Sequence, residues 1–458
     1  MAQERIRGPL GYFEMTSLAS SRGKENFLSA FRRRFEQGND GSPLWLAELR
    51  RGAIEKFAES GLPTTRHEDW KYTNVDPINA LSFDIPRQNG VEIPTTNLLA
   101  CAMAEGARHR LVFINGFYSA KHSSTGNLPA GVRVLHLAEI LSRDDPREAS
   151  WLTRPTEMQD KPFVALNTAF MEDGAVVIIP GHCRMEEPIY TIFLSSGAVA
   201  PFVSHPRNLF ICGEGSEVEI VESYVGLGTG AYFSNPVTDI AAAADSVVNH
   251  YRLQSEGPGA FHVGVVRARL ERHSNLNSHS VTLGGGLVRN DVHALLDGEG
   301  AECNLNGLYV SDGQQHIDNH TEIEHAQPRA VSHELYKGIL GGRAHGVFNG
   351  KILVRKAAQK SDARQSNKNL LLSKDAVINS KPQLEIYADD VKCSHGSTIG
   401  QLDPDALFYL RSRGIGAEDS RALLSYAFAA DILGGVKNAP LRARLDEFLL
   451  TKFSKTAG

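Results

Sequence analysis

The stretch "VKCSHGS" places a cysteine and a histidine two residues apart, at positions 393 and 395. Thiolate and imidazole both bind zinc and iron in proteins. Residues two apart on a strand point to the same side, so the spacing puts Cys393 and His395 on one face. Two ligands do not complete a metal site, and the residues alone therefore favour a structural role for this pair.

A second segment, "HIDNHTEIEH", alternates imidazole and carboxylate side chains with other residues: His316, Asp318, His320, Glu322 and Glu324. This ligand set suits zinc or non-haem iron. Side chains two apart on a strand are separated by about 7 Å, so only some of them could share one ion. We therefore interpret the segment as the solvated face of a strand, with Ile317, Thr321 and Ile323 pointing inward.

No phosphate-binding loop is present in the sequence. The run "GVFNGKI" at residues 346–352 has a Gly-Lys pair, but it lacks the glycine spacing and the Ser or Thr of a P-loop. If the protein takes part in an ATP-driven process, we expect a partner to hydrolyse the nucleotide.

The composition is that of a soluble globular protein. The 458 residues are 41% hydrophobic and 22% charged, and the formal net charge of -5 gives no general reason to bind nucleic acid. The five cysteines are widely spread and form no C-x-x-C pair, which favours a reducing cytoplasm over a disulfide framework or a ferredoxin-type cluster site. No apolar run reaches the roughly 18 to 20 residues of a membrane span, and the N-terminus has no secretory signal pattern.

Three regions of the sequence differ in their predicted secondary structure. Residues 1–170 mix helical patterns, strongest from about 24 to 61, with a strand that meets the hairpin dipeptide Asn115-Gly116. Residues 171–400 consist of short β-rich runs, with related patterns recurring at intervals of about 25 to 45 residues: Val218, Val247, Leu276, Cys303 and Val347. A stacked parallel β-helix explains this long stretch best, because each coil needs its neighbours to bury its face. A jelly roll or double sandwich is the alternative.

Residues 401–458 return to helix. Asp403 and Pro404 form a helix start and Gly414 a stop. Two further helices are predicted at about 418–433 and 441–453. The second of the three is apolar on more than one side, which predicts a small helical domain with apolar surface left for a partner.

Three segments carry a resemblance to a known family: "SHELYKGILGGRAHGVFNGKILV" at 332–354, the run from "AQKSDARQSNKNLLL" to "LFYLRSRGI" at 358–415, and "GLPTTRHEDWKYTNV" at 61–75. They resemble the SufB/SufD family, the scaffold subunits of the SUF iron–sulfur cluster assembly machine. Asn367 stands where SufB has a cysteine regarded as a cluster-building ligand, and "VKCSHGS" has the SufD form. The family's functional histidine falls on His395.

The resemblance implies a right-handed parallel β-helix between helical terminal domains, and a role as a non-enzymatic scaffold. It implies pairing with a SufB-like subunit, with His395 and Cys393 at the interface and His395 as a metal ligand shared with the partner. A transient iron–sulfur cluster would form there, and the resemblance also allows a reduced flavin in the complex. A SufC-like ATPase would dock on the C-terminal helices, at Leu407, Phe408, Tyr409, Leu410, Arg411, Arg413, Gly414, Leu424 and Phe428.

Two other functions remain open. A β-helix enzyme acting on carbohydrate could use Asp318, Glu322 and Glu324 as acid or base. A purely structural adaptor would leave His395 inert. Self-pairing into a homodimer in the absence of partners is also left open.

Overall fold

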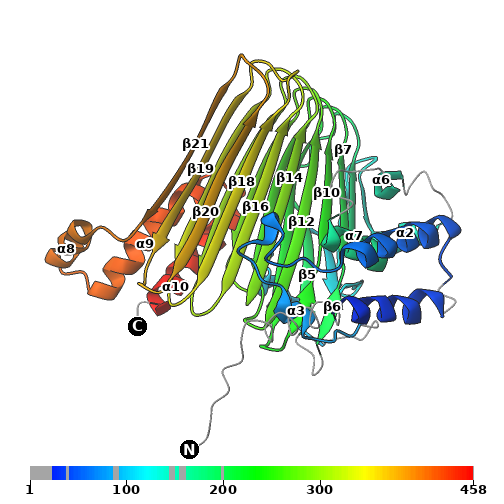
Figure 1. Ribbon diagram of the computed structural model, residues 1–458, viewed down its shortest axis with the longest axis horizontal. Helices are drawn as coiled ribbons and strands as arrows, with labels where there is room; N and C mark the ends of the chain where they lie inside the picture. The colour runs from blue at the N-terminus through cyan, green and yellow to red at the C-terminus, as the bar shows by residue number, and fades with distance from the viewer. Residues whose placement is uncertain are drawn as a thin grey trace, which may run out of the picture.

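The computed structural model describes residues 23–37, 41–85, 92–143, 150–153, 161–196 and 201–456. Long strands stack side by side along the molecule, with helices at both ends (Figure 1). Neighbouring strands in the body of both sheets are parallel and are separated in the chain by a strand of the other sheet. The predicted parallel β-solenoid is therefore confirmed, and the sandwich alternatives are wrong.

Within the described residues the strands form two sheets. Sheet B contains ten strands, in spatial order β2 (Phe117–Tyr118), β1 (His109–Ile114), β5 (Ile189–Ser196), β8 (Glu217–Leu227), β11 (Val247–Ser255), β13 (Asn275–Thr282), β15 (Glu302–Ser311), β17 (Val331–Leu340), β19 (Asp362–Leu371) and β21 (Lys392–Gly400). Sheet A contains eleven: β20 (Val377–Ile386), β18 (His345–Val354), β16 (His316–His325), β14 (Leu287–Leu296), β12 (Ala260–Leu270), β10 (Val237–Ala242), β7 (Arg207–Cys212), β4 (Ala175–Ile179) and β3 (Arg133–His136). The other two are β9 (Tyr232–Ser234), which pairs with β12, and β6 (Phe202–Ser204), which pairs with β9.

Each coil of the central part gives one strand to each sheet. Equivalent residues of successive coils are 27 to 31 positions apart in sheet B and 26 to 32 positions apart in sheet A. One inward column of sheet B consists of Val218, Val248, Leu276, Cys303, Ser332, Ala363 and Cys393. Three of the predicted repeat positions lie in this column. Val247 precedes its member by one residue, and Val347 belongs to sheet A, so the predicted interval was too wide because it mixed the two sheets.

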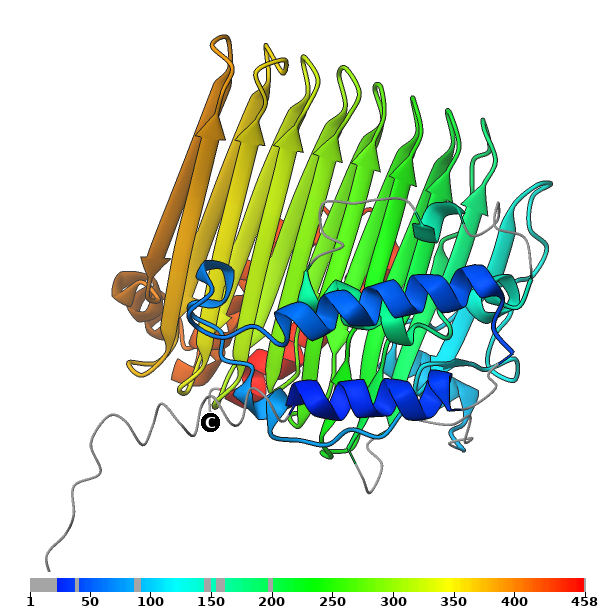
Figure 2. The same ribbon diagram turned by 45° about the vertical axis from the view of Figure 1, so that its right-hand side comes forward.

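Most of the N-terminal region packs against sheet A, whereas helix α4 (Thr95–Cys101) packs on strands β1, β5 and β8 of sheet B. The helices of this region are residues 23–31, η1 (Arg32–Glu36), α2 (Leu44–Ser60), η2 (Glu68–Trp70), α3 (Asp76–Asn79), α4, α5 (Leu137–Leu141), α6 (Ser150–Thr153) and α7 (Pro162–Phe170). Aromatic rings pack this region together: the ring centroids of Phe27 and Phe57 are 5.9 Å apart, and those of Phe31 and Phe170 are 5.8 Å apart. Figure 2 shows α2 lying across the strands. Strands β1 to β3, which fall within residues 1–170, already belong to the two sheets.

The predicted hairpin joins β1 and β2, which pair antiparallel. Asn115 and Gly116 have φ angles of 50° and 91°. Positive φ at both central residues is what a type I′ turn requires, and this explains the Asn-Gly pair.

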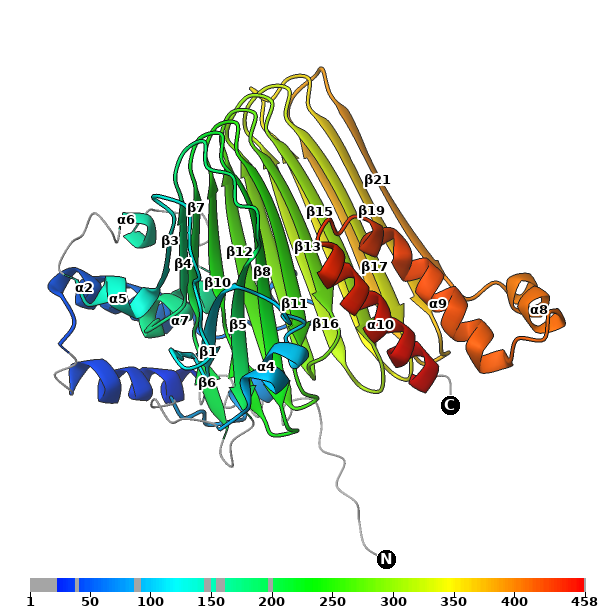
Figure 3. The same cartoon turned by 180° about the vertical axis from the view of Figure 1, so that it is seen from behind.

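The C-terminal helices are α8 (Pro404–Ser412), α9 (Ala417–Gly434) and α10 (Ala439–Thr456). Asp403 caps α8 by accepting from the Asp405 N–H at 2.9 Å, as the sequence predicts. Figure 3 shows α9 and α10 lying on the outer face of sheet B, while α8 projects beyond the last coil. Ile432 and Leu445 share an apolar core with sheet B, whereas α8 buries no residue.

None of the helices in the described ranges combines the length and the apolar composition needed to cross a membrane.

Candidate functional site

The last coil of the solenoid is open. Within the described residues, β20 pairs only with β18, and β21 only with β19. Neither terminal strand contains a buried residue, whereas β19 alternates buried and exposed positions. Large apolar side chains are exposed at this end: Val377 at 51%, Tyr387 at 63% and Ile399 at 53%. The predicted pair of residues 393 and 395 lies on β21, at this end.

Cys393 points into the solenoid. It packs against a buried apolar cluster at the end of the interior that includes Ile352 and Ala363. Burial raises the pKa of the Cys393 thiol, and the nearby charge of Asp362 raises it further. The structure therefore favours a protonated thiol that packs as a small apolar group.

His395 stands on the same side of β21 as Cys393, but its side chain is exposed. It lies in register with Gln365 of β19, the strand that pairs with β21 in the described part of the chain. No hydrogen-bond partner for the imidazole is found among the described residues. A free imidazole at an uncovered end is accessible to a metal ion or to a partner.

Asn367, at the position that the resemblance assigns to a cysteine of SufB, is fully buried in the interior. Its Nδ2 donates to the Tyr336 carbonyl at 3.2 Å, and its Oδ1 accepts from Asn369 Nδ2 at 2.6 Å and from Ser380 Oγ at 2.8 Å. Ser397 on the last strand donates to Ser380 at 2.8 Å. The amide of Asn367 thus links the last two coils through a chain of hydrogen bonds. This gives Asn367 a structural role.

A second polar pair, which the sequence reasoning missed, lies behind His395. Gln365 Nε2 donates to Glu334 Oε2 at 2.7 Å, and both side chains are buried. Burial raises the pKa of Glu334 to about 7. Glu334, Gln365 and His395 occupy one register position in three successive coils. The only sequence signal for this alignment is the coil repeat itself. The length of each coil must be known to within a single residue before the alignment can be predicted.

The strand with the His and acid pattern, β16, is not solvated as we expected. Residues 61–75, which we call the strap, cover the outer face of sheet A at this strand. Thr73 Oγ1 lies 2.8 Å from His316 Nε2 and donates to Asp318 Oδ2 at 2.5 Å. Arg289 NH1 donates to the same carboxylate oxygen at 3.0 Å, and its guanidinium lies 3.8 Å from the Trp70 ring centroid. The inward placement of Ile317 and Ile323 is confirmed.

Asp318 is an ionised structural group. Burial would raise the pKa of its carboxyl, but the charges of His320 and Arg289, with the hydrogen bonds from His320 and Thr73, outweigh burial and hold the pKa well below its usual range. Such a carboxylate is a poor general acid at neutral pH.

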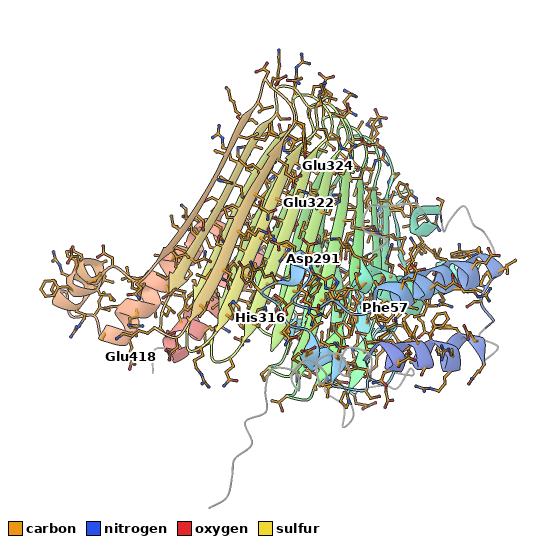
Figure 4. The ribbon with its side chains drawn as sticks, in the orientation of Figure 1. Phe57, Asp291, His316, Glu322, Glu324 and Glu418 are labelled. Carbon is orange, nitrogen blue, oxygen red and sulfur yellow. The ribbon has the colours of Figure 1, made fainter. Side chains whose placement is uncertain are left out.

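The other acids of β16 are also engaged. Glu324 is buried and pairs with Arg355, and Glu322 lies 3.6 Å from Lys351 Nζ. Figure 4 shows His316, Glu322 and Glu324 spread along the strand. Within the described ranges, no three His, Cys, Asp or Glu side chains are arranged to hold a metal ion. The geometry therefore gives no support to a metal site here or to a carboxylate pair poised for glycoside cleavage.

A cavity of about 240 Å³ lies between the strap, the start of α7 and the outer face of sheet A. The basic side chains that line it are already paired, Arg289 with Asp291 at 2.8 Å and Lys161 with Asp69 at 2.7 Å. The cavity is a gap between packed elements with satisfied charges.

The predicted ATPase-docking residues divide into two groups. Phe408 and Tyr409 on α8 are 73% and 58% exposed, and Arg411, Arg413 and Gly414 are exposed beside them. Leu407, Leu410, Leu424 and Phe428 are half-buried. Phe428 packs on the sheet B core, and Lys337 Nζ lies 4.7 Å from its ring centroid. The free apolar surface is thus concentrated on α8.

The architecture defines a class of protein: a parallel β-solenoid with helical ends, an open last coil and a projecting helix. Residues 193–428 match the model of the SufBD core domain of the SUF system for FeS cluster assembly, and residues 21–191 match that of the SufBD N-terminal region. The chain belongs to the SufBD family of iron–sulfur cluster assembly proteins.

Curated relatives agree over nearly the whole length. An iron–sulfur cluster assembly SufBD family protein of Synechocystis is 34% identical, with 87% of this chain and 89% of the relative covered. The iron–sulfur cluster assembly protein SufD of Escherichia coli is 30% identical over 86% of this chain and 89% of its own length. The SufD of Bacillus subtilis is 23% identical, with 89% of this chain and 93% of the relative covered.

Proposed function

We propose that the chain is a SufD-type scaffold subunit that pairs through its open last coil with a SufB-like subunit, and that nascent iron–sulfur clusters form at their interface. The observation that carries the proposal is the uncovered end formed by β20 and β21. A SufC-like ATPase completes the complex, which acts in the cytoplasm.

The open end has the physical features of an interface. Each terminal strand leaves one row of backbone N–H and C=O groups unpaired, and such an edge is a template for pairing with another strand. The exposed Val377, Tyr387 and Ile399 would lose contact with water when a partner covers them. A second solenoid whose end strands continue both sheets satisfies both requirements.

His395 is the side chain that offers a ligand at this interface. One imidazole is only part of the coordination of a cluster, which takes four protein ligands, so the partner must supply the others. Because iron binds the neutral imidazole, His395 would have to be deprotonated at its ligating nitrogen. Cys393 has an inward position and a raised thiol pKa, and it shapes the end of the interior beneath the histidine.

The projecting helix α8 supports the ATPase part of the proposal. Phe408 and Tyr409 form an exposed apolar patch that α8 cannot bury itself. The adjoining α9 rests on sheet B, and Lys337 Nζ lies 2.5 Å from Asp431 of α9. Movement of the docked ATPase would therefore act on a helix that is attached to the solenoid near its open end. The reduced flavin belongs to the proposal only as a ligand of the complex, with no residue of this chain assigned to it.

Partner pairing can be tested by co-expression with the SufB-like and SufC-like subunits of the same organism. Ile399→Lys places a charge on the open end, whereas Leu450→Lys places one at an apolar residue of α10 that is 43% exposed. We expect the first variant to lose the SufB-like subunit on size-exclusion chromatography with light scattering, and the second to retain it. Retention of the partner by both Ile399→Lys and an Ile399→Lys/Tyr387→Asp double variant would contradict the proposal.

A further inference from the structure

We propose that Gln365 is a positioning residue for His395: its side-chain carbonyl accepts a hydrogen bond from one ring nitrogen and so leaves the other free to bind iron. The inference rests on the proposed function, because it assumes that His395 is a ligand at the interface. It adds one residue of the solenoid interior, Gln365, to the site.

The register brings the two side chains together. Gln365 and His395 are directly paired residues of adjacent parallel strands, β19 and β21. Gln365 points inward, because it bonds to the buried Glu334 of the preceding coil. His395 is on the same side of its strand as Cys393, which packs in the interior. Side chains of paired residues on one face of neighbouring strands stack about 5 Å apart, so the imidazole of His395 can reach the amide of Gln365.

The hydrogen bond to Glu334 fixes which end of the amide faces His395. Because Gln365 Nε2 donates to Glu334 Oε2 at 2.7 Å, the oxygen Oε1 is the group left over. Oε1 is buried and has no hydrogen-bond partner among the described residues. A carboxyl group has an acceptor oxygen in both its ionised and its protonated state, so Glu334 holds this orientation in either.

Gly350 on the facing strand β18 keeps the amide in place. A Cβ atom at Gly350 would lie 2.3 Å from Gln365 Nε2 and 2.7 Å from Cζ of Phe348. The Gln365 amide therefore sits against the bare backbone of Gly350, where any larger residue would displace it. The unpaired oxygen Oε1 of Gln365 thus lies in the packed interior and not on an exposed surface side chain.

A carbonyl acceptor can do one thing for a neighbouring imidazole: it selects the tautomer that carries hydrogen on the facing nitrogen. The opposite nitrogen then has its lone pair directed away from the solenoid, toward the partner. Outer partners of this kind orient metal-binding histidines generally, and their loss weakens metal binding about 10- to 100-fold.

The test uses this chain, labelled with ¹⁵N-histidine, in complex with its unlabelled SufB-like partner. The His395 ring signals are identified by their loss in His395→Ala. We expect one dominant neutral tautomer in the wild type and a mixture in Gln365→Met, which keeps the length of the side chain but removes the acceptor. Gln365→Asn, which keeps a buried amide but shortens it, should give the same mixture if the methionine variant does not assemble.

Glu334→Gln is the matched control. Its side-chain carbonyl can still accept from Gln365 Nε2, so the wild-type tautomer should be kept. Ferrous ion titration of the same complexes should give about 10- to 100-fold weaker binding for the Gln365 variants and little change for Glu334→Gln.

An unchanged His395 tautomer in both Gln365 variants would overturn the inference. Its failure is distinguishable from failure of the proposed function: if His395→Ala abolishes iron binding while the Gln365 variants bind normally, the site stands and the positioning role falls. If His395→Ala itself binds iron normally, the ligand role is wrong and the positioning role falls with it.

Discussion

Cys393 and His395 are two residues apart on one strand face, yet their surroundings differ. The cysteine packs against the apolar cluster of Ile352 and Ala363 at the end of the interior, and burial raises its thiol pKa. The histidine is exposed at an open end. We therefore assign packing to the first and ligand chemistry to the second.

Replacing Cys393 should have a small effect. Cys393→Ala removes one sulfur from a half-buried site, and we expect a loss of about 1 kcal/mol or less in the free energy of unfolding. Cluster content of the complex should remain close to that of the wild type when measured by absorbance. Loss of the cluster together with unchanged stability would show that the thiol is a ligand.

Glu334 gives a pH-dependent prediction. Its pKa rises from 4.5 to about 7 on folding, so between these values the unfolded chain releases a proton that the folded chain keeps. The stability of the wild type therefore falls as the pH rises through this window. Glu334→Gln should raise the free energy of unfolding by about 2 to 3 kcal/mol at pH 8 and change it little at pH 4.5. Thermal melts at the two pH values check this, and an equal effect at both would contradict it.

At the scale of elements, the strap is the segment that explains the charged strand β16. Residues 61–75 bring Thr73 to His316 and Asp318, and Trp70 to Arg289. Glu68 reaches Lys381 of β20 in a close ion pair. The histidines and acids that suggest a metal site in the sequence thus form the surface of sheet A on which the N-terminal strap packs.

This explanation predicts that the buried charged residues of β16 contribute to the stability of the folded chain. Asp318→Asn leaves Arg289 buried with one fewer charged partner, and we expect a loss of about 3 kcal/mol in the free energy of unfolding. Glu322→Gln on the same strand breaks only a half-exposed pair with Lys351 and should cost less than about 1 kcal/mol. Chemical denaturation measures both. Equal effects would mean that the strap contact is unimportant.

Helix α8 gives a separate prediction, about ATPase docking. Phe408→Ser with Tyr409→Ser removes the exposed patch and should abolish capture of the SufC-like subunit, with the melting temperature unchanged because neither ring is buried. Leu450→Ser on α10 is the matched control. Point substitutions are preferable to deletion of residues 403–458, because α9 and α10 cover the sheet B core. Capture of the ATPase by the double variant would contradict the assignment.

At the scale of the whole molecule, local features could be predicted from sequence, and alignments between coils could not. The Asn115-Gly116 hairpin and the Asp403 cap depend on a few neighbouring residues, and both are confirmed. The repeat was placed one residue off at Val247 because the spacing between successive coils varies between 26 and 32 residues. The same variation hid the alignment of Gln365 with His395.

Contacts between distant segments were also invisible in the sequence. Thr73 and Asp318 are 245 positions apart, so nothing near Asp318 indicates that it is covered. The open end follows from where the solenoid stops. Only the stacked coils reveal that β20 and β21 have no second neighbouring strand among the residues that the structure describes. The exposure of His395, and with it the candidate site, depends on that arrangement.

The open end also predicts the behaviour of the isolated chain. Two unpaired strand edges with exposed Tyr387 and Ile399 favour self-association when no partner is present. Light scattering should therefore detect a dimer of the isolated chain that Ile399→Lys weakens. A wild-type monomer at concentrations of tens of micromolar would contradict this expectation.

The most direct measurement of the central claim is the iron and sulfide content of the complex carrying His395→Ala. The variant is expressed with its SufB-like and SufC-like partners, beside the wild type and His333→Ala, which removes an exposed histidine from β17 away from the open end. We predict normal subunit composition and melting temperature in all three complexes, with cluster absorbance, iron and sulfide lost only in His395→Ala. Wild-type cluster content in the His395→Ala complex would contradict the account.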